Sequence, residues 1–142
     1  MSLKIFADLM SQPSRAIVMF CRAAKVPHEF KELRIKNGDF KTPEMAKINP
    51  FEKVSHEIST KICIFNFLLF FQSPCAEHNG VPLVESMAIL RYITNVFDVD
   101  SHWYPKDPLA QQKVEEYLHW QHTNTRLQCA MYFQVKIQLK IT

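Results

Sequence analysis

Met10-Ser11-Gln12-Pro13-Ser14-Arg15 connects a strand-like run, Leu3-Lys4-Ile5-Phe6, to a segment with helical periodicity. Apolar residues recur at i, i+3, i+4 and i+7 from Ile17 to Ala24, which predicts an amphipathic helix over residues 13–25. Pro13 suits the first turn of that helix, because the amide it lacks has no partner there. Free backbone N–H groups and the helix dipole therefore favour a negative charge beside Ser11.

Ser11 is the candidate catalytic residue of this stretch. Its hydroxyl can donate a hydrogen bond to a bound thiolate, and such a bond to a charged group is worth roughly 1.5–3 kcal/mol. Because about 1.36 kcal/mol corresponds to one pKa unit, a thiol of pKa about 8.5 would then ionise near neutral pH. The alternative is that Ser11 or Ser14 only caps the helix.

Composition excludes several classes of function. The 142 residues allow one domain, or a small domain plus a fragment of another. The 17 basic and 14 acidic residues are interspersed, and the net charge of +3 argues against a nucleic-acid partner. With two glycines in the whole chain, no glycine-rich phosphate loop is expected. No segment reaches the roughly 20 apolar residues of a membrane span, and no apolar signal core follows Met1.

Cysteine and histidine spacing predicts neither disulfides nor a metal site. The four cysteines are widely spread without a C-x-x-C motif, which favours reduced thiols and a cytoplasmic location. His119 and His122 lie at i, i+3 on a predicted helix, but no third ligand stands at matching spacing. We therefore expect no bound metal.

Turn and cap signals order the rest of the chain. A strand is predicted from His28 to Ile35, and a short helix from Thr42-Pro43-Glu44 to the residue before Asn49-Pro50. His78-Asn79-Gly80 predicts a hairpin turn into Val81–Val84, where Pro82 requires an edge strand. Glu85-Ser86 opens the next helix.

The order of these elements, βαβα, hairpin, helix, predicts an α/β fold. We expect a thioredoxin-like domain over residues 1–97 and a polar, proline-containing linker over 98–108. A further helix, from about Leu109 into the last residues, would make 109–142 a fragment of an all-α C-terminal domain.

Four ordered motifs resemble the theta-class glutathione transferases. They are Ser11-Gln12-Pro13-Ser14-Arg15-Ala16, Ile48-Asn49-Pro50-Phe51-Glu52-Lys53-Val54, the run from Asn79 to Tyr92, and Trp120-Gln121-His122-Thr123-Asn124-Thr125-Arg126. The resemblance covers residues 1–54 and about 74–135. It implies that glutathione is a co-substrate with no other cofactor, that the partner substrate is a small electrophile, and that the protein can form a homodimer.

The resemblance also implies roles for individual residues. The residue implied to hold the thiolate is Ser11, those implied to contact the tripeptide are Lys53, Val54, Pro74, Glu85 and Ser86, and the one implied to lie near the electrophile is Arg126. The charges at Glu85 and Ser86 fit the implied binding of the tripeptide. Ser86 and the free amides of its helix can bind a carboxylate, and Glu85 can pair with an amino group. Glu85-Ser86 as a simple N-cap and Arg126 as a solvated arginine are the alternatives. One position departs from the family: Phe40 stands where a glutathione-contacting histidine is usual.

A segment between Val54 and Pro74 separates two motifs that the family joins directly. Ser55–Ser73 matches no part of the family, and Ile62–Phe71 holds nine apolar residues around Asn66. Val54-Ser55 and Phe71-Gln72 are compatible with splice-site codons, so we hypothesise translated intron sequence. Removing Val54–Gln72 or Ser55–Ser73 restores the family spacing, and sequencing the transcript distinguishes an intron from a genuine lineage-specific insertion.

The resemblance further implies that the family's helical domain continues beyond the segment matching Met131–Gln134, so that most of its electrophile wall is missing here. The sequence thus predicts a truncated, inserted glutathione transferase with little activity in this form. A non-catalytic thioredoxin-like binding module and a non-functional product are the alternatives.

Deleting residues 55–73 is expected to raise soluble yield and protease resistance. The apolar half of the segment has no charge and no proline, which is the composition of an aggregation-prone segment. Soluble fraction and limited proteolysis of the deletion variant measure the effect beside the parent chain. Equal or poorer solubility of the variant would show that the segment packs usefully.

Overall fold

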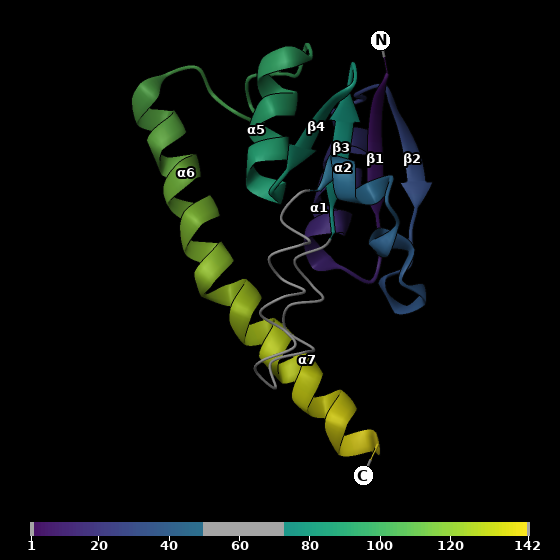
Figure 1. Ribbon diagram of the computed structural model, residues 1–142. Coiled ribbons are helices and arrows are strands. Elements are labelled where there is room, and N and C mark those ends of the chain that lie inside the picture. Colours follow the sequence, from purple (N-terminus) through teal and green to yellow (C-terminus); the bar gives the residue numbers. More distant parts are fainter. Residues whose placement is uncertain (1, 50–72, 142) are drawn as a thin grey trace. The chain divides into compact units, whose positions relative to one another are not determined.

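The computed structural model describes residues 2–49 and 73–141 (Figure 1). It separates into two compact units, Met1–Val99 and Asp100–Thr142. The segment Ser55–Gln72 and the candidate site residues Lys53 and Val54 lie outside the described residues.

The first unit is a four-stranded sheet with helices on both faces. Its strands lie side by side in the order β2-β1-β3-β4 (Figure 1), with β1 parallel to β2 and antiparallel to β3. The elements in chain order are β1 (Leu3–Ala7), α1 (Gln12–Ala23), β2 (His28–Glu32), the 3-10 turns η1 (Ile35–Asn37) and η2 (Asp39–Lys41), α2 (Met45–Ile48), β3 (Cys75–His78), β4 (Val81–Val84) and α5 (Ser86–Val96). This βαβ unit followed by a hairpin and a helix confirms the predicted thioredoxin-like α/β fold.

The hairpin forms as its sequence predicts. Asn79 and Gly80 have φ values of 54° and 78°, the left-handed pair that a two-residue turn between twisted strands requires. β4 is an edge strand, so Pro82 removes no hydrogen bond from the interior of the sheet.

Two elements are shorter than predicted. β2 ends at Glu32 rather than Ile35, because the amide of Ile35 donates to the Asp8 carboxylate at 2.8 Å and leaves the sheet. α2 covers Met45–Ile48, preceded by Thr42, whose hydroxyl accepts from the amide of Met45 at 3.2 Å. Thr42 therefore makes a capping bond, although the helix proper starts later than the sequence indicates.

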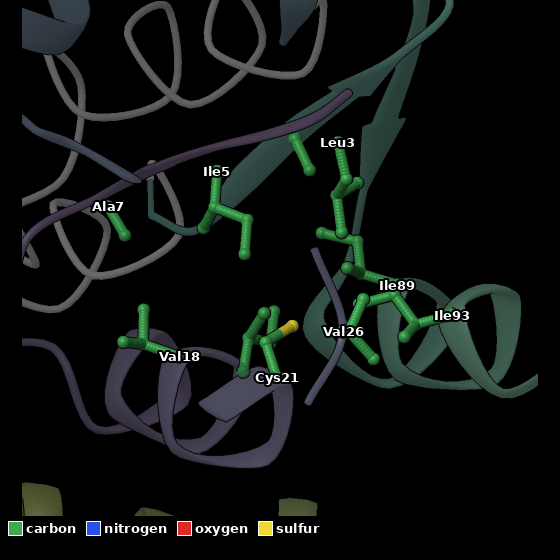
Figure 2. Packing of buried hydrophobic residues seen from close by; sticks show 10 residues of the cluster. Leu3, Ile5, Ala7, Val18, Cys21, Val26, Ile89 and Ile93 are labelled. Atoms are coloured by element: carbon green, nitrogen blue, oxygen red, sulfur yellow. The ribbon is translucent and has the colours of Figure 1, made fainter. Parts of the chain in front are cut away.

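Alternation along β1 divides the core between the two faces of the sheet. Leu3, Ile5 and Ala7 point towards α1 and α5, where they meet Val18, Cys21, Ile89 and Ile93 (Figure 2). Phe6 points to the opposite face. There it forms a second cluster with Phe40, Met45, Ile48 and Cys75.

The second unit is helical. α6 (Pro108–Thr123) starts at Asp107, whose carboxylate accepts from the amide of Ala110 at 2.8 Å, and α7 (Thr125–Ile141) follows. The prediction of one uninterrupted helix is therefore wrong. At Asn124 the side-chain amide donates to the Trp120 carbonyl at 2.9 Å, and this local bond accompanies a non-helical backbone. Among the described helices, none has the length and apolarity needed to cross a membrane.

Cys21 is expected to resist alkylation in the folded protein, whereas Cys129 reacts. Burial raises the pKa of the Cys21 thiol from its ordinary 9.0 to about 11, while Cys129 is exposed on α7. At pH 8 only about one Cys21 in a thousand is the reactive thiolate. Peptide mapping after brief iodoacetamide treatment, with a urea-unfolded control, measures both sites. Equal labelling in the folded protein would contradict the buried position of Cys21.

Candidate functional site

The sheet register brings three segments that are far apart in the sequence to one end of the sheet. Phe6 of β1 pairs with Cys75 of β3, and Cys75 pairs with Val84 of β4. The turn from Asp8 to Ser11 follows β1, the Ser73-Pro74 dipeptide precedes β3, and the Glu85-Ser86 dipeptide follows β4. Four predicted site residues, Ser11, Pro74, Glu85 and Ser86, therefore share one end of the sheet.

Ser11 is the N-cap residue of α1, but its hydroxyl makes no capping bond. Its backbone is extended and its amide donates to the Asp8 carbonyl at 2.9 Å. Its hydroxyl donates instead to the Ser73 carbonyl, with an O···O distance of 3.3 Å. The Ser14 hydroxyl is bonded to the Ser73 hydroxyl at 2.7 Å. Both hydroxyls therefore bind Ser73 rather than the free amides of the first turn of α1.

The bond from Ser11 to Ser73 is long. Hydroxyl donors usually lie about 2.7–2.8 Å from an oxygen acceptor, so 3.3 Å indicates a weak bond. A negatively charged acceptor makes a stronger bond than a neutral carbonyl and would compete for the same hydrogen. The side chain of Ser11 is 0% exposed, so an acceptor from solution reaches it only after neighbouring atoms move.

Asp8 ties this turn to the rest of the unit. Its carboxylate is 3% exposed and accepts from the amides of Met10 and Ile35, each at 2.8 Å. The Arg15 guanidinium closes the outer side of the turn by donating to the carbonyls of Leu9 and Met10, at 2.8 Å and 3.0 Å. Asp8 is not among the site residues predicted from the sequence. Its signal was an aspartate directly after a strand and two residues before an amide that it can accept from.

Ser73 and Pro74 are buried and joined by a cis peptide bond. The Ser73 hydroxyl accepts from the amide of Asp8 at 3.1 Å in addition to its bond with Ser14. Ser73 is the last residue of Ser55–Ser73, the segment between the two family-like motifs. Its buried contacts with Asp8, Ser11 and Ser14 make it part of the site.

Glu85 and Ser86 lie at the start of α5. Glu85 is exposed, has a φ of 69° that is uncommon outside glycine, and makes no side-chain cap bond. Glu85 is thus the N-cap residue of α5 by position, but its side chain does not cap the helix. Ser86 is buried as the first helical residue, where the free amides of the first turn suit an anionic group.

The structure shows the contacts of two further positions singled out in the sequence, Phe40 and Arg126. Phe40 is 1% exposed and packs with Phe6 and Met45, so it is a core residue. Arg126 belongs to the second unit, where its guanidinium donates to Nδ1 of His122 at 2.9 Å. Within the described ranges 2–49 and 73–141, no group of three potential metal ligands occurs.

Comparison with known proteins shows which sequences and folds this chain is similar to. The family profile described as "Glutathione S-transferase, N-terminal domain" matches residues 59–95. The match includes residues 59–73, so the expectation that this segment matches no part of the family is not met. Theta-1 glutathione S-transferase of Rattus norvegicus is 32% identical over 141 residues, covering 99% of this chain and 51% of that protein. The T1 enzyme of Arabidopsis thaliana is 34% identical over 133 residues, covering 93% of this chain and 46% of that protein.

Solved structures show the same relationship. Human glutathione transferase theta-2, in complex with glutathione and an unknown ligand, superposes with a TM-score of 0.68 at 31% identity, covering 85% of this chain and 42% of that one. The apo form of human glutathione S-transferase T1-1 gives 0.67 at 32% identity, with 86% and 43% covered.

The fold is that of the N-terminal, thioredoxin-like domain of glutathione transferases. Within that group, the chain is a relative of the theta class. It spans about half the length of the curated relatives it matches.

Replacing Asp8 by alanine is expected to destabilise the first unit by about 2–4 kcal/mol. The change removes the acceptor of two amides at 2.8 Å, and leaving such groups unpaired in a part-buried turn costs about 1–3 kcal/mol each. Asp8→Asn keeps one carbonyl oxygen and should lose about half as much. Urea unfolding of the three proteins measures the difference, and equal stability would show that water replaces the carboxylate.

Proposed function

We propose that this chain carries a glutathione site and that its family's reaction, conjugation of reduced glutathione to an electrophile, is the function of its lineage. The observation that carries the proposal is the state of Ser11. Its hydroxyl lies at the N-terminus of α1, beside Ser73-Pro74, and is held by a weak bond of 3.3 Å to a neutral carbonyl. A thiolate placed there gains a hydrogen bond and the favourable end of a helix dipole.

The remaining site residues fit recognition of the tripeptide. Pro74 borders the Ser11 turn, while Ser86 and the free amides of α5 suit the γ-glutamyl carboxylate and exposed Glu85 suits its ammonium group. Lys53 and Val54, outside the described residues, are proposed to complete the site by resemblance. Arg126 is proposed to lie near the electrophile, also by resemblance.

The proposed chemistry is a nucleophilic substitution or addition. The glutathione sulfur attacks an electrophilic carbon and forms a C–S bond. In the substitution, the leaving group departs with the electron pair of its bond to carbon. In the addition, the electron pair of the π bond moves to the far atom, which takes a proton from water. Ser11 stabilises the attacking thiolate and forms no covalent bond itself. The proton of the thiol passes to solvent when glutathione binds.

We propose little or no conjugation by the chain as given. Ser11 has no exposed surface, and catalysis suffers about 10²-fold when reacting groups are misplaced by about 1 Å. A cytoplasmic location and a homodimer are further parts of the proposal, supported by the same resemblance.

A non-catalytic thioredoxin-like binding module is the second candidate, favoured by the burial of Ser11. Retention on immobilised glutathione, eluted by free reduced glutathione, supports a working site for either candidate. Conjugation measured with a panel of small electrophiles separates the two. Absence of both retention and conjugation would favour the non-functional product.

Ser11→Ala is expected to raise the pKa of bound glutathione by about one to two units in a repaired protein. That protein lacks Ser55–Ser73, so that Val54 is retained and precedes Pro74, and it is extended by the remaining helices of a theta-class relative. The shift corresponds to the roughly 1.5–3 kcal/mol of a hydrogen bond to a charged group, and to about 10- to 100-fold in rate at neutral pH. Titration of thiolate absorbance measures the shift.

Ser11→Thr serves as the companion variant. It keeps the hydroxyl but adds a methyl group at a fully buried position, so it should be tolerated poorly. An unchanged thiol pKa in the alanine variant would remove Ser11 from the mechanism.

A further inference from the structure

Ser73 holds both flanks of the turn that carries Ser11. One oxygen, Ser73 Oγ, accepts from the amide of Asp8 at 3.1 Å and is bonded to the Ser14 hydroxyl at 2.7 Å. Asp8 is three residues before Ser11 and Ser14 is three residues after it. The backbone on each side of Ser11 is therefore fixed to the same side chain, which enters from the start of β3.

Burial makes these bonds effective. Asp8 and Ser73 are each 3% exposed and Ser14 is fully buried, so water has little access to replace a lost partner. A buried donor or acceptor left unpaired is costly, and hydrogen bonds are stronger where the local dielectric is low. Ser73 can accept from the Asp8 amide and donate to Ser14 at the same time, which satisfies its one hydrogen and one of its lone pairs.

The Ser73 carbonyl acts on Ser11 itself. It accepts the Ser11 hydroxyl at 3.3 Å, whereas the Ser14 hydroxyl, at 2.7 Å from Ser73 Oγ, is bound at full strength. Among Ser11, Ser14 and Ser73, Ser11 has the longest hydroxyl contact. Of the three hydroxyls, Ser11 can therefore most easily redirect its hydrogen bond to a new acceptor.

We infer that Ser73 is a positioning residue for Ser11. Its hydroxyl braces the Asp8–Ser14 turn, and its carbonyl keeps the Ser11 hydroxyl oriented until a thiolate takes the hydrogen bond. The part that concerns the thiolate rests on the proposed function, while the bracing does not. A valine before Pro74, as the family pattern has it, lacks the hydroxyl and provides no such brace.

Amide hydrogen exchange on the full chain without ligand tests the brace. In Ser73→Ala the amides of Asp8 and Ser11 should exchange roughly 5- to 100-fold faster, because the first loses its acceptor and the second lies in the turn that is released. The amide of Val26, bonded to the Cys21 carbonyl at 2.8 Å beyond the other end of α1, is the internal control and should not change. Ser14→Ala, which removes only the partner on α1, should accelerate Ser11 more than Val26.

Two exchange results would overturn the inference. One is unchanged exchange at Asp8 and Ser11 in Ser73→Ala. The other is equal acceleration at Asp8, Ser11 and Val26, which would mean that Ser73 contributes only to global stability. Ser73→Thr retains the hydroxyl and should restore slow exchange at Asp8, which separates loss of the hydrogen bond from loss of packing.

Reduced glutathione is the probe for the second step. If the parent chain binds it, Ser73→Ala should raise the pKa of the bound thiol by about one unit, and Ser73→Thr should return it towards the parent value. An unchanged thiol pKa in Ser73→Ala would overturn the positioning role. If glutathione binds to no variant while exchange at Asp8 still responds to Ser73→Ala, the proposed function fails and the brace stands.

Discussion

The antiparallel pairing of β3 with β1 is the constraint on which the site depends. It joins residues more than 60 positions apart in the chain, and its register places Ser73 beside Asp8. The same strand pairs with β4 on its other side, so the Glu85-Ser86 dipeptide arrives at the same edge. A shift of one residue in this register would turn Cys75 and Ala76 to the wrong faces and exchange the residues of two cores.

A cluster of hydroxyl and carboxylate groups lies at the end of the β1–β3 pairing. The Asp8 carboxylate serves two backbone amides, Ser14 and Ser73 bind each other, and Ser11 is left with a long bond to a carbonyl. Buried polar groups usually satisfy one another, and here the least satisfied hydroxyl belongs to the residue that the family resemblance marks for chemistry. The Ser11 hydroxyl is therefore oriented by the Ser73 carbonyl, and exchanging this acceptor for another costs little free energy because the bond is weak.

Local signals predicted most of the fold. The 3.6-residue periodicity of α1 and α5, the Asn79-Gly80 turn and the edge position of Pro82 depend on a few neighbouring residues, and the structure confirms each of them. The predicted element boundaries were wrong where a polar side chain forms a hydrogen bond with a backbone group. Asp8 takes the amide of Ile35 and shortens β2, and Asn124 binds the Trp120 carbonyl where α6 ends. Such polar bonds leave little trace in a hydrophobic pattern, because the residue types that make them are common in loops as well.

The sequence by itself determined the order of the elements, the candidate residue Ser11 and the class of protein, since each follows from short motifs and local periodicity. The tertiary structure alone decided what the hydroxyls do. Whether Ser11 and Ser14 cap a helix or bind Ser73 depends on a contact across more than 55 residues, which strand register creates. It also decided that Ser73 belongs to the site and Phe40 to the core, because burial and hydrogen bonding are properties of neighbours in space.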